Sequence, residues 1–144
     1  MPIVHVKHVS TEPESPLRPN QDGNDFKPEV KPLQSEHIEE KNVNSAFIGT
    51  GLEKYLRQNN IDKVVLVGLT TDHCVSTTTR MAANLGFDTY VISDATATFN
   101  RTALDGKNLD ADSVHEYALA SLNGEFATVV DTSAILHLLD KNNV

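Results

Sequence analysis

A continuous apolar run that stops at a glycine constrains the fold more than any other feature of this chain. The run is Val64–Val67, and Gly68 ends it. Four successive apolar residues are typical of a strand buried on both faces, as in a parallel sheet. Thr71 and Asp72 follow, and both residue types favour the N-terminus of a helix. The pattern predicts a buried parallel strand that turns directly into a helix.

The only cysteine of the chain, Cys74, lies at this turn. Apolar and small residues then recur at helical spacing and predict a helix from about Cys74 to Leu85. The N–H groups and positive dipole end of a first helical turn stabilise a thiolate, and a parallel sheet has its ligand crevice at the carboxyl ends of its strands. Cys74 is therefore a candidate nucleophile. The alternative is a small buried apolar side chain.

The rest of the chain alternates between strand and helix patterns. Strands are predicted at 3–9, about 37–41, 63–68, 88–93 and 126–130, and helices at 51–59, 74–85, about 113–122 and 133–139. Capping-box spacing, Thr50 with Glu53 and Ser113 with Glu116, predicts two of the helix starts. Residues 10–35 lack periodicity and hold five of the six prolines, which predicts a long surface loop. This order implies βαβ units with a parallel sheet and right-handed crossovers.

Composition narrows the class of protein. A length of 144 residues fits one domain, 1–144, with a single core. The net charge of -8 argues against nucleic acid or an anionic membrane as a partner. One cysteine excludes an intramolecular disulfide and suits a reducing compartment, and no apolar run is long enough for a signal peptide or a membrane span. We therefore expect a cytoplasmic protein.

The stretch Gly68-Leu69-Thr70-Thr71-Asp72-His73-Cys74-Val75 resembles the nucleophile motif of the isochorismatase-like cysteine hydrolases. This family includes nicotinamidases and carbamoylsarcosine amidases. Further matching segments lie on both sides of the motif: Lys41, Ser45–Phe47, Thr50–Glu53, Thr78–Ala82, Leu85–Phe87 and Asp94–Phe99. The resemblance extends from Val4 to about Leu139 and implies a three-layer α/β/α fold with a mainly parallel sheet.

The resemblance also implies roles for individual residues. Cys74 is the family's nucleophile, and Lys41 is its active-site lysine, whose ammonium group supports the thiolate. Taken alone, a lysine at position 41 would be interpreted as a solvated surface charge. A cis peptide bond is implied at Leu69-Thr70, and the backbone N–H groups of Thr70 and Cys74 are implied to form the oxyanion hole.

The same matching segments place Phe47 and Phe99 in the substrate pocket. Residues 10–35, where the family varies its specificity, match no subgroup, so the substrate is not identified.

The family's catalytic aspartate has no counterpart in this sequence. It ordinarily ends an N-terminal strand that reads hydrophobic-hydrophobic-Asp-Met-Gln, whereas this chain begins at what resembles the family's second strand. Truncation, a late start in the gene model and true shortening are all open explanations. Asp72 is interpreted as a helix-start residue and Asp94 as a strand-end loop residue, rather than as replacement bases. Unpaired strand edges would then favour a homo-oligomer and weak catalysis.

Six histidines raise the question of a metal site. His5 and His8 are three residues apart on a predicted strand and face opposite sides, and the loop at 10–35 holds no histidine. A papain-like dyad of His73 with Cys74 is disfavoured, since adjacent side chains diverge on a helix. We expect structural or solvent-facing histidines and no metal or other cofactor.

The sequence thus predicts a cysteine hydrolase that cleaves an amide or related C–N bond of a small molecule through a thioester. The presence of Cys74 argues against a true isochorismatase, which lacks the cysteine. The alternative is a catalytically incompetent, shortened member of the family that serves as a binding or oligomer-forming subunit.

Overall fold

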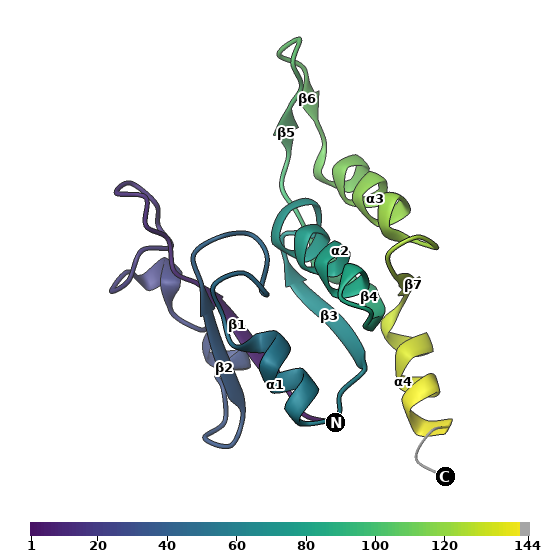
Figure 1. Ribbon diagram of the computed structural model, residues 1–144. Coiled ribbons are helices and arrows are strands. Elements are labelled where there is room, and N and C mark those ends of the chain that lie inside the picture. Colours follow the sequence, from purple (N-terminus) through teal and green to yellow (C-terminus); the bar gives the residue numbers. More distant parts are fainter. Residues whose placement is uncertain (142–144) are drawn as a thin grey trace. The chain divides into compact units, whose positions relative to one another are not determined.

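The computed structural model describes residues 1–141, and the chain divides into two compact units (Figure 1). Unit 1 is Met1–Asn60, and unit 2 begins at Ile61. Each unit has a parallel sheet of its own. No helix within residues 1–141 combines the length and the apolar character that a membrane crossing requires.

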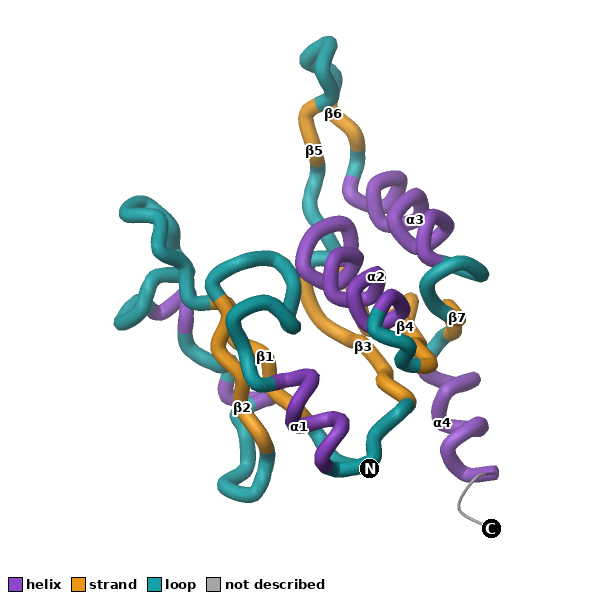
Figure 2. Tube along the Cα trace, in the orientation of Figure 1, coloured by secondary structure: helices purple, strands orange, loops and turns teal. Residues whose placement is uncertain are grey.

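Unit 1 contains a pair of parallel strands, β1 (Val4–His8) and β2 (His37–Lys41). In their register Val4 lies opposite His37, and His8 lies opposite Lys41. The segment between them is the predicted long loop, interrupted only by two 3-10 turns, Asp22–Asn24 and Pro28–Val30 (Figure 2). The loop is fixed by the buried Asn24, whose Nδ2 donates to the carbonyl of His8 at 2.6 Å and that of Leu17 at 2.8 Å.

Helix α1 (Leu52–Gln58) completes unit 1 and buries Leu52 and Leu56. Its predicted capping box is wrong. The carboxylate of Glu53 pairs with Arg57 one turn further on, at 3.4 Å. The N-cap residue of the helix is instead Gly51, and its N–H donates to the Glu39 carboxylate of β2 at 3.0 Å.

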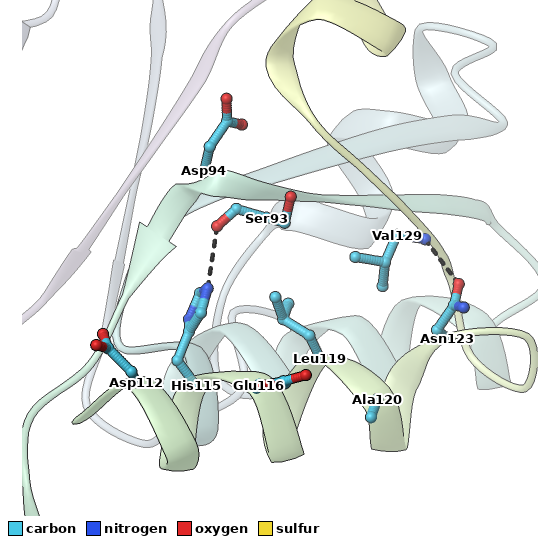
Figure 3. Close-up of a pocket in the computed structure, with 9 residues that line it drawn as sticks. All are labelled: Ser93, Asp94, Asp112, His115, Glu116, Leu119, Ala120, Asn123 and Val129. Carbon is cyan, nitrogen blue, oxygen red and sulfur yellow. Dashed lines mark hydrogen bonds between the residues drawn. The ribbon is translucent and has the colours of Figure 1, made fainter. Parts of the chain in front are cut away.

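Unit 2 contains a three-stranded parallel sheet in the order β3-β4-β7. The strands are β3 (Lys63–Leu69), β4 (Asp88–Ala97) and β7 (Thr128–Val130). Helices α2 (Ser76–Asn84) and α3 (Ala111–Leu122) connect them and pack against each other, and α4 (Thr132–Lys141) follows β7. In Figure 3, α3 lies on one side of β4 and α4 on the other, so unit 2 has the predicted α/β/α layers.

The core of unit 2 lies between the sheet and helices α2 and α3. Val91 of β4 and Leu122 of α3 are fully buried. Apolar residues from the strands, from α3 and from the turns surround them: Leu66, Val75, Leu119, Phe126, Ala127 and Val129. The apolar run that predicted β3 supplies Leu66 to this core.

Strand β4 is longer than predicted and carries a bulge. Leu66 pairs with Val91, but Gly68 pairs with Thr96, so five steps along β4 match two along β3. The strand therefore resumes after an irregular stretch and ends at Ala97 rather than at residue 93. The polar pair Ser93 and Asp94 interrupts the apolar pattern, which is why sequence periodicity ended the strand too early.

A short antiparallel hairpin, β5 (Arg101–Thr102) with β6 (Asn108–Leu109), extends from unit 2 (Figure 1). Its turn is closed by bonds from Gly106 N–H to the Ala103 carbonyl at 2.9 Å and from Ala103 N–H to the Lys107 carbonyl at 2.8 Å. The hairpin was not predicted, because strands of two residues produce no periodic pattern.

Other boundaries also differ from the predictions. Asp110 is the N-cap residue of helix α3, and its carboxylate accepts from the N–H and the hydroxyl of Ser113, both at 2.9 Å, so the Ser113 capping box is wrong. Strand β7 begins two residues later than predicted. The N–H groups of Phe126 and Ala127 bond back to the Leu122 carbonyl at 3.0 Å and belong to the preceding turn.

Candidate active site

Cys74 lies in a π-helical turn, Thr71–Val75, which we call the Cys74 turn. The turn joins the carboxyl end of β3 to α2, and the carbonyl of Thr70 accepts from the N–H groups of His73 at 3.1 Å and Val75 at 3.2 Å. The predicted helix is present, but it begins at Ser76 as α2, two residues later than predicted, because residues 71–75 form the π turn. A π turn widens the helix by one residue and occurs frequently at functional sites. Cys74 is half-buried in it.

The peptide bond Leu69-Thr70 directly precedes the Cys74 turn and is cis. This is the bond for which the sequence resemblance implied that geometry. Thr70 adopts an extended backbone and is the first residue before the turn. The roles of the Thr70 and Cys74 N–H groups as oxyanion donors remain a proposal.

The start of the Cys74 turn is fixed by a hydrogen bond to helix α3. Thr71 is fully buried, and its hydroxyl lies 2.8 Å from Nδ1 of His115. Nε2 of the same ring lies 3.1 Å from the carbonyl oxygen of Ser93, in the bulge of β4. His115 therefore has the structural role expected for it, but its partners could not be read from the sequence.

Asp72 lies in the first turn of the π-helical segment, where a helix-start residue was predicted, but no side chain caps this turn and the Asp72 carboxylate binds side chains from the following segment. Arg101 donates to it through Nε at 2.7 Å and Nη2 at 3.1 Å, and the hydroxyl of Thr98 donates at 2.5 Å. Burial opposes the charge, but these bonds from Arg101 and Thr98 hold the pKa of Asp72 well below its usual range. Sequence reasoning missed Arg101, since an isolated arginine carries no pattern.

Asp94 lies within β4, in the bulge, and not in the predicted strand-end loop. Its Oδ1 accepts from both the N–H and the hydroxyl of Thr132 at 2.8 Å. These bonds from Thr132 lower the pKa of the Asp94 carboxyl group. Asp94 thereby fixes the first residue of α4.

A pocket of about 560 Å³ lies between the β4 bulge and α3 (Figure 3). Acidic, apolar and amide side chains surround His115 in its lining: Ser93, Asp94, Asp112, Glu116, Leu119, Ala120, Asn123 and Val129. Cys74 is not among the lining residues, so we do not assign this pocket as the substrate site.

Lys41 ends strand β2 in unit 1 and is only 6% exposed, which excludes its alternative interpretation as a solvated surface charge. Its Nζ donates to the carbonyl of Val43 at 2.9 Å and to Nδ1 of His8 at 3.0 Å. Burial and the Lys41 charge both lower the pKa of His8. A lysine ammonium can only donate, so Nδ1 accepts and His8 is neutral in this contact.

Parallel pairing of the two predicted strands would have brought His8 beside Lys41. The sequence therefore held the signal for this contact, but the register of the strands was needed to use it.

The remaining predicted residues differ in exposure. Phe47 is half-buried in unit 1, in the segment after β2, and its N–H donates to the Ser45 hydroxyl at 3.2 Å. Phe99 is 63% exposed in unit 2 and directly follows Thr98. Residues 1–141 contain no group of three or more His, Cys, Asp or Glu side chains that could hold a metal ion.

Comparison with known proteins places this chain in a family. Residues 1–134 match the Isochorismatase domain model. Isochorismatase family protein YrdC of Bacillus subtilis is 48% identical over 135 residues, which cover 94% of this chain and 72% of the relative.

Solved structures of isochorismatase-family proteins are also similar to this chain. A crystal structure from Chromobacterium violaceum, assigned as a hydrolase of the isochorismatase family, has a TM-score of 0.93 and 44% identity, and the match covers 100% of this chain and 74% of that one. N-carbamoylsarcosine amidase of Thermoplasma acidophilum has a TM-score of 0.70 and 28% identity, over 91% of this chain and 73% of that one. The predicted fold class is thus confirmed, and the chain, with its cysteine between a parallel strand and a helix, belongs to the isochorismatase family of hydrolases.

Proposed function

We propose that this chain is a cysteine hydrolase that cleaves an amide or related C–N bond of a small molecule, with Cys74 as the nucleophile. The observation that carries the proposal is the place of Cys74, in a turn that leaves the carboxyl end of a parallel strand and enters a helix. The similarity to a carbamoylsarcosine amidase supports C–N bond hydrolysis as the reaction class.

The reaction then has two steps. The Cys74 thiolate attacks the substrate carbonyl carbon to form a thioester, the C–N bond breaks, and the amine leaves after taking one proton from solvent. Water then attacks the thioester, the C–S bond breaks, and the acid and the thiolate are released as one proton returns to solvent. Two backbone N–H groups, those of Thr70 and Cys74, are proposed to stabilise the oxyanion in both steps.

The other assignments rest on the resemblance of the matching segments. Lys41 is proposed as the cation that supports the thiolate, since a positive charge near a thiol lowers its pKa. Phe47 and Phe99 are proposed to contact the substrate.

The test combines thiol chemistry with turnover. Iodoacetamide labelling of Cys74 across pH should give an apparent pKa clearly below the value of about 8.5 for a free cysteine. A panel of small amides should be hydrolysed by the chain and not by its Cys74→Ala variant. A thiol that is unreactive in the folded protein would reject the nucleophile assignment and favour the alternative of a non-catalytic binding subunit.

We also propose self-association. Strand β3 is an edge strand of the sheet in unit 2, and its side chains Val67 and Leu69 are 60% and 59% exposed. An apolar edge strand is a template for pairing with another chain. Sedimentation at several concentrations tests this, and a monomer at every concentration would refute it.

A further inference from the structure

The contact between Asp72 and Arg101 joins the Cys74 turn to the β5–β6 hairpin. Asp72 is two residues before Cys74, and Arg101 is the first residue of β5. The ladder pairs Leu69 with Ala97, so the Cys74 turn and the segment that leads to β5 leave adjacent strands at the same edge of the sheet. This adjacency brings the guanidinium and the carboxylate together.

We infer that Arg101 is a positioning residue, which acts through Asp72 to hold the Cys74 turn and to neutralise the carboxylate nearest to the nucleophile in the chain. The inference rests on the proposed function, because it gives Arg101 a role only if Cys74 is the nucleophile.

The geometry of the contact supports positioning. Two guanidinium nitrogens donate to the two different carboxylate oxygens, which fixes both the position and the orientation of Asp72. Thr98 donates to the same carboxylate and accepts from Nη2 of Arg101 at 3.4 Å. The Asp72 side chain is 16% exposed, so solvent screens this pair less than an exposed one.

The charges of Asp72 and Arg101 give a second reason to assign Arg101 as a positioning residue. A carboxylate close to a thiol disfavours the thiolate, because the two negative charges repel. Paired with Arg101, the Asp72 carboxylate has its charge balanced. Without Arg101 its charge would lie unpaired by the guanidinium in the same turn as Cys74 and would disfavour the thiolate.

The experiment measures iodoacetamide alkylation of Cys74 against pH in the full chain. We compare the wild type with Arg101→Gln, Asp72→Asn and the double variant. Arg101→Gln should shift the alkylation profile to higher pH and slow alkylation at pH 7 by up to about tenfold, since a change of one pKa unit changes the thiolate fraction by at most tenfold. The double variant should return toward the wild-type profile, because it has no unpaired carboxylate.

The matched control is Lys107→Gln. It removes one positive charge from the same hairpin, but Lys107 pairs with Asp105 at 2.6 Å and is 80% exposed. Its pH profile should equal that of the wild type. Arg101→Lys keeps the charge without the two-pronged contact, and should recover most of the wild-type profile. If Arg101→Gln does not fold, Arg101→Met removes the same charge and should shift the profile in the same direction.

The outcomes separate the inference from the proposed function. A wild-type thiol with an ordinary pKa would overturn the proposed function. An activated wild-type thiol with unchanged profiles in both Arg101 variants would overturn the inference alone. Additive effects in the double variant would also overturn it, because they would mean that Arg101 does not act through Asp72.

Discussion

The hydroxyl of Thr71 and Nδ1 of His115 lie 2.8 Å apart and connect the fully buried first residue of the Cys74 turn to helix α3. Nε2 of His115 lies 3.1 Å from the Ser93 carbonyl, which can only accept, so Nε2 carries a proton. In the neutral ring Nδ1 is then the acceptor and Thr71 the donor. One histidine thus fixes the turn, the bulge of β4 and α3 together.

Replacing His115 should destabilise unit 2. His115→Ala leaves the buried Thr71 hydroxyl without this partner, and an unsatisfied buried donor costs about 1–3 kcal/mol. Chemical denaturation measures the loss. In a Thr71→Val background the same substitution should cost less, because the hydroxyl is already absent.

The control for that cycle is His137→Ala, at an exposed position of α4. It should change the free energy of unfolding by no more than a few tenths of a kcal/mol, roughly. Equal costs of His115→Ala in both backgrounds would show that the contact with Thr71 contributes nothing.

Asp72→Asn should destabilise the protein at neutral pH and progressively less in acid. The pKa of Asp72 is lowered in the fold, so its contribution is fully present above the ordinary carboxyl pKa of about 3.9 and is lost as pH falls toward the folded value. Loss of the charged contact should cost about 2 kcal/mol at pH 7.

Denaturation of the wild type and of Asp72→Asn from pH 7 to pH 3 measures this difference. Asp105→Asn is the control, since its partner Lys107 is largely exposed. A difference between wild type and Asp72→Asn that stays constant with pH would contradict the electrostatic origin of the effect.

His8 should make the protein less stable in mild acid. Its pKa is lowered in the fold, by burial first and by Lys41 second, so below about pH 6.5 the unfolded chain takes up a proton that the folded chain does not. Stability therefore decreases as pH falls through this range and stops decreasing below the folded pKa. His8→Gln should reduce the slope, as measured by melting temperature between pH 7.5 and pH 5.

A His137→Gln variant, with His8 intact, should keep the wild-type slope. If His8→Gln also kept the wild-type slope of melting temperature against pH, the contact between His8 and Lys41 would have no effect on stability in acid.

The sequence predicted the strands and helices whose residue patterns are regular. The apolar run at Val64–Val67 located β3, and helical spacing located α2 to within two residues of its start. Periodicity could not predict the π turn, because inserting one residue changes hydrogen bonding without changing the residue pattern. It also could not distinguish Asp110 from Ser113 as the cap of α3, since both residue types favour that position.

The sequence predicted only those site residues that are neighbours along the chain. Cys74, Thr70 and Leu69 are contiguous, and their motif is specific. Arg101 and Thr98 reach Asp72 through the register of β3 with β4, and that register includes the bulge after Val91. Contacts that depend on a bulge require the three-dimensional structure.

Asp94 should stabilise the start of helix α4 and have no effect on the reactivity of Cys74. Its carboxylate accepts two bonds from Thr132, and its pKa is lowered by them, so it stays ionised well into mild acid. Asp94→Ala removes the oxygen that accepts both bonds and should lower the melting temperature while leaving the pH profile of Cys74 alkylation unchanged. Asp131→Ala is the matched variant, because Asp131 accepts from the Ala134 N–H of the same helix at 2.7 Å. If Asp94 were a catalytic base, Asp94→Ala would lose amide turnover and Asp131→Ala would not, at equal losses of stability. We expect the two variants to retain turnover equally, since the Asp94 carboxylate is already engaged at the start of α4.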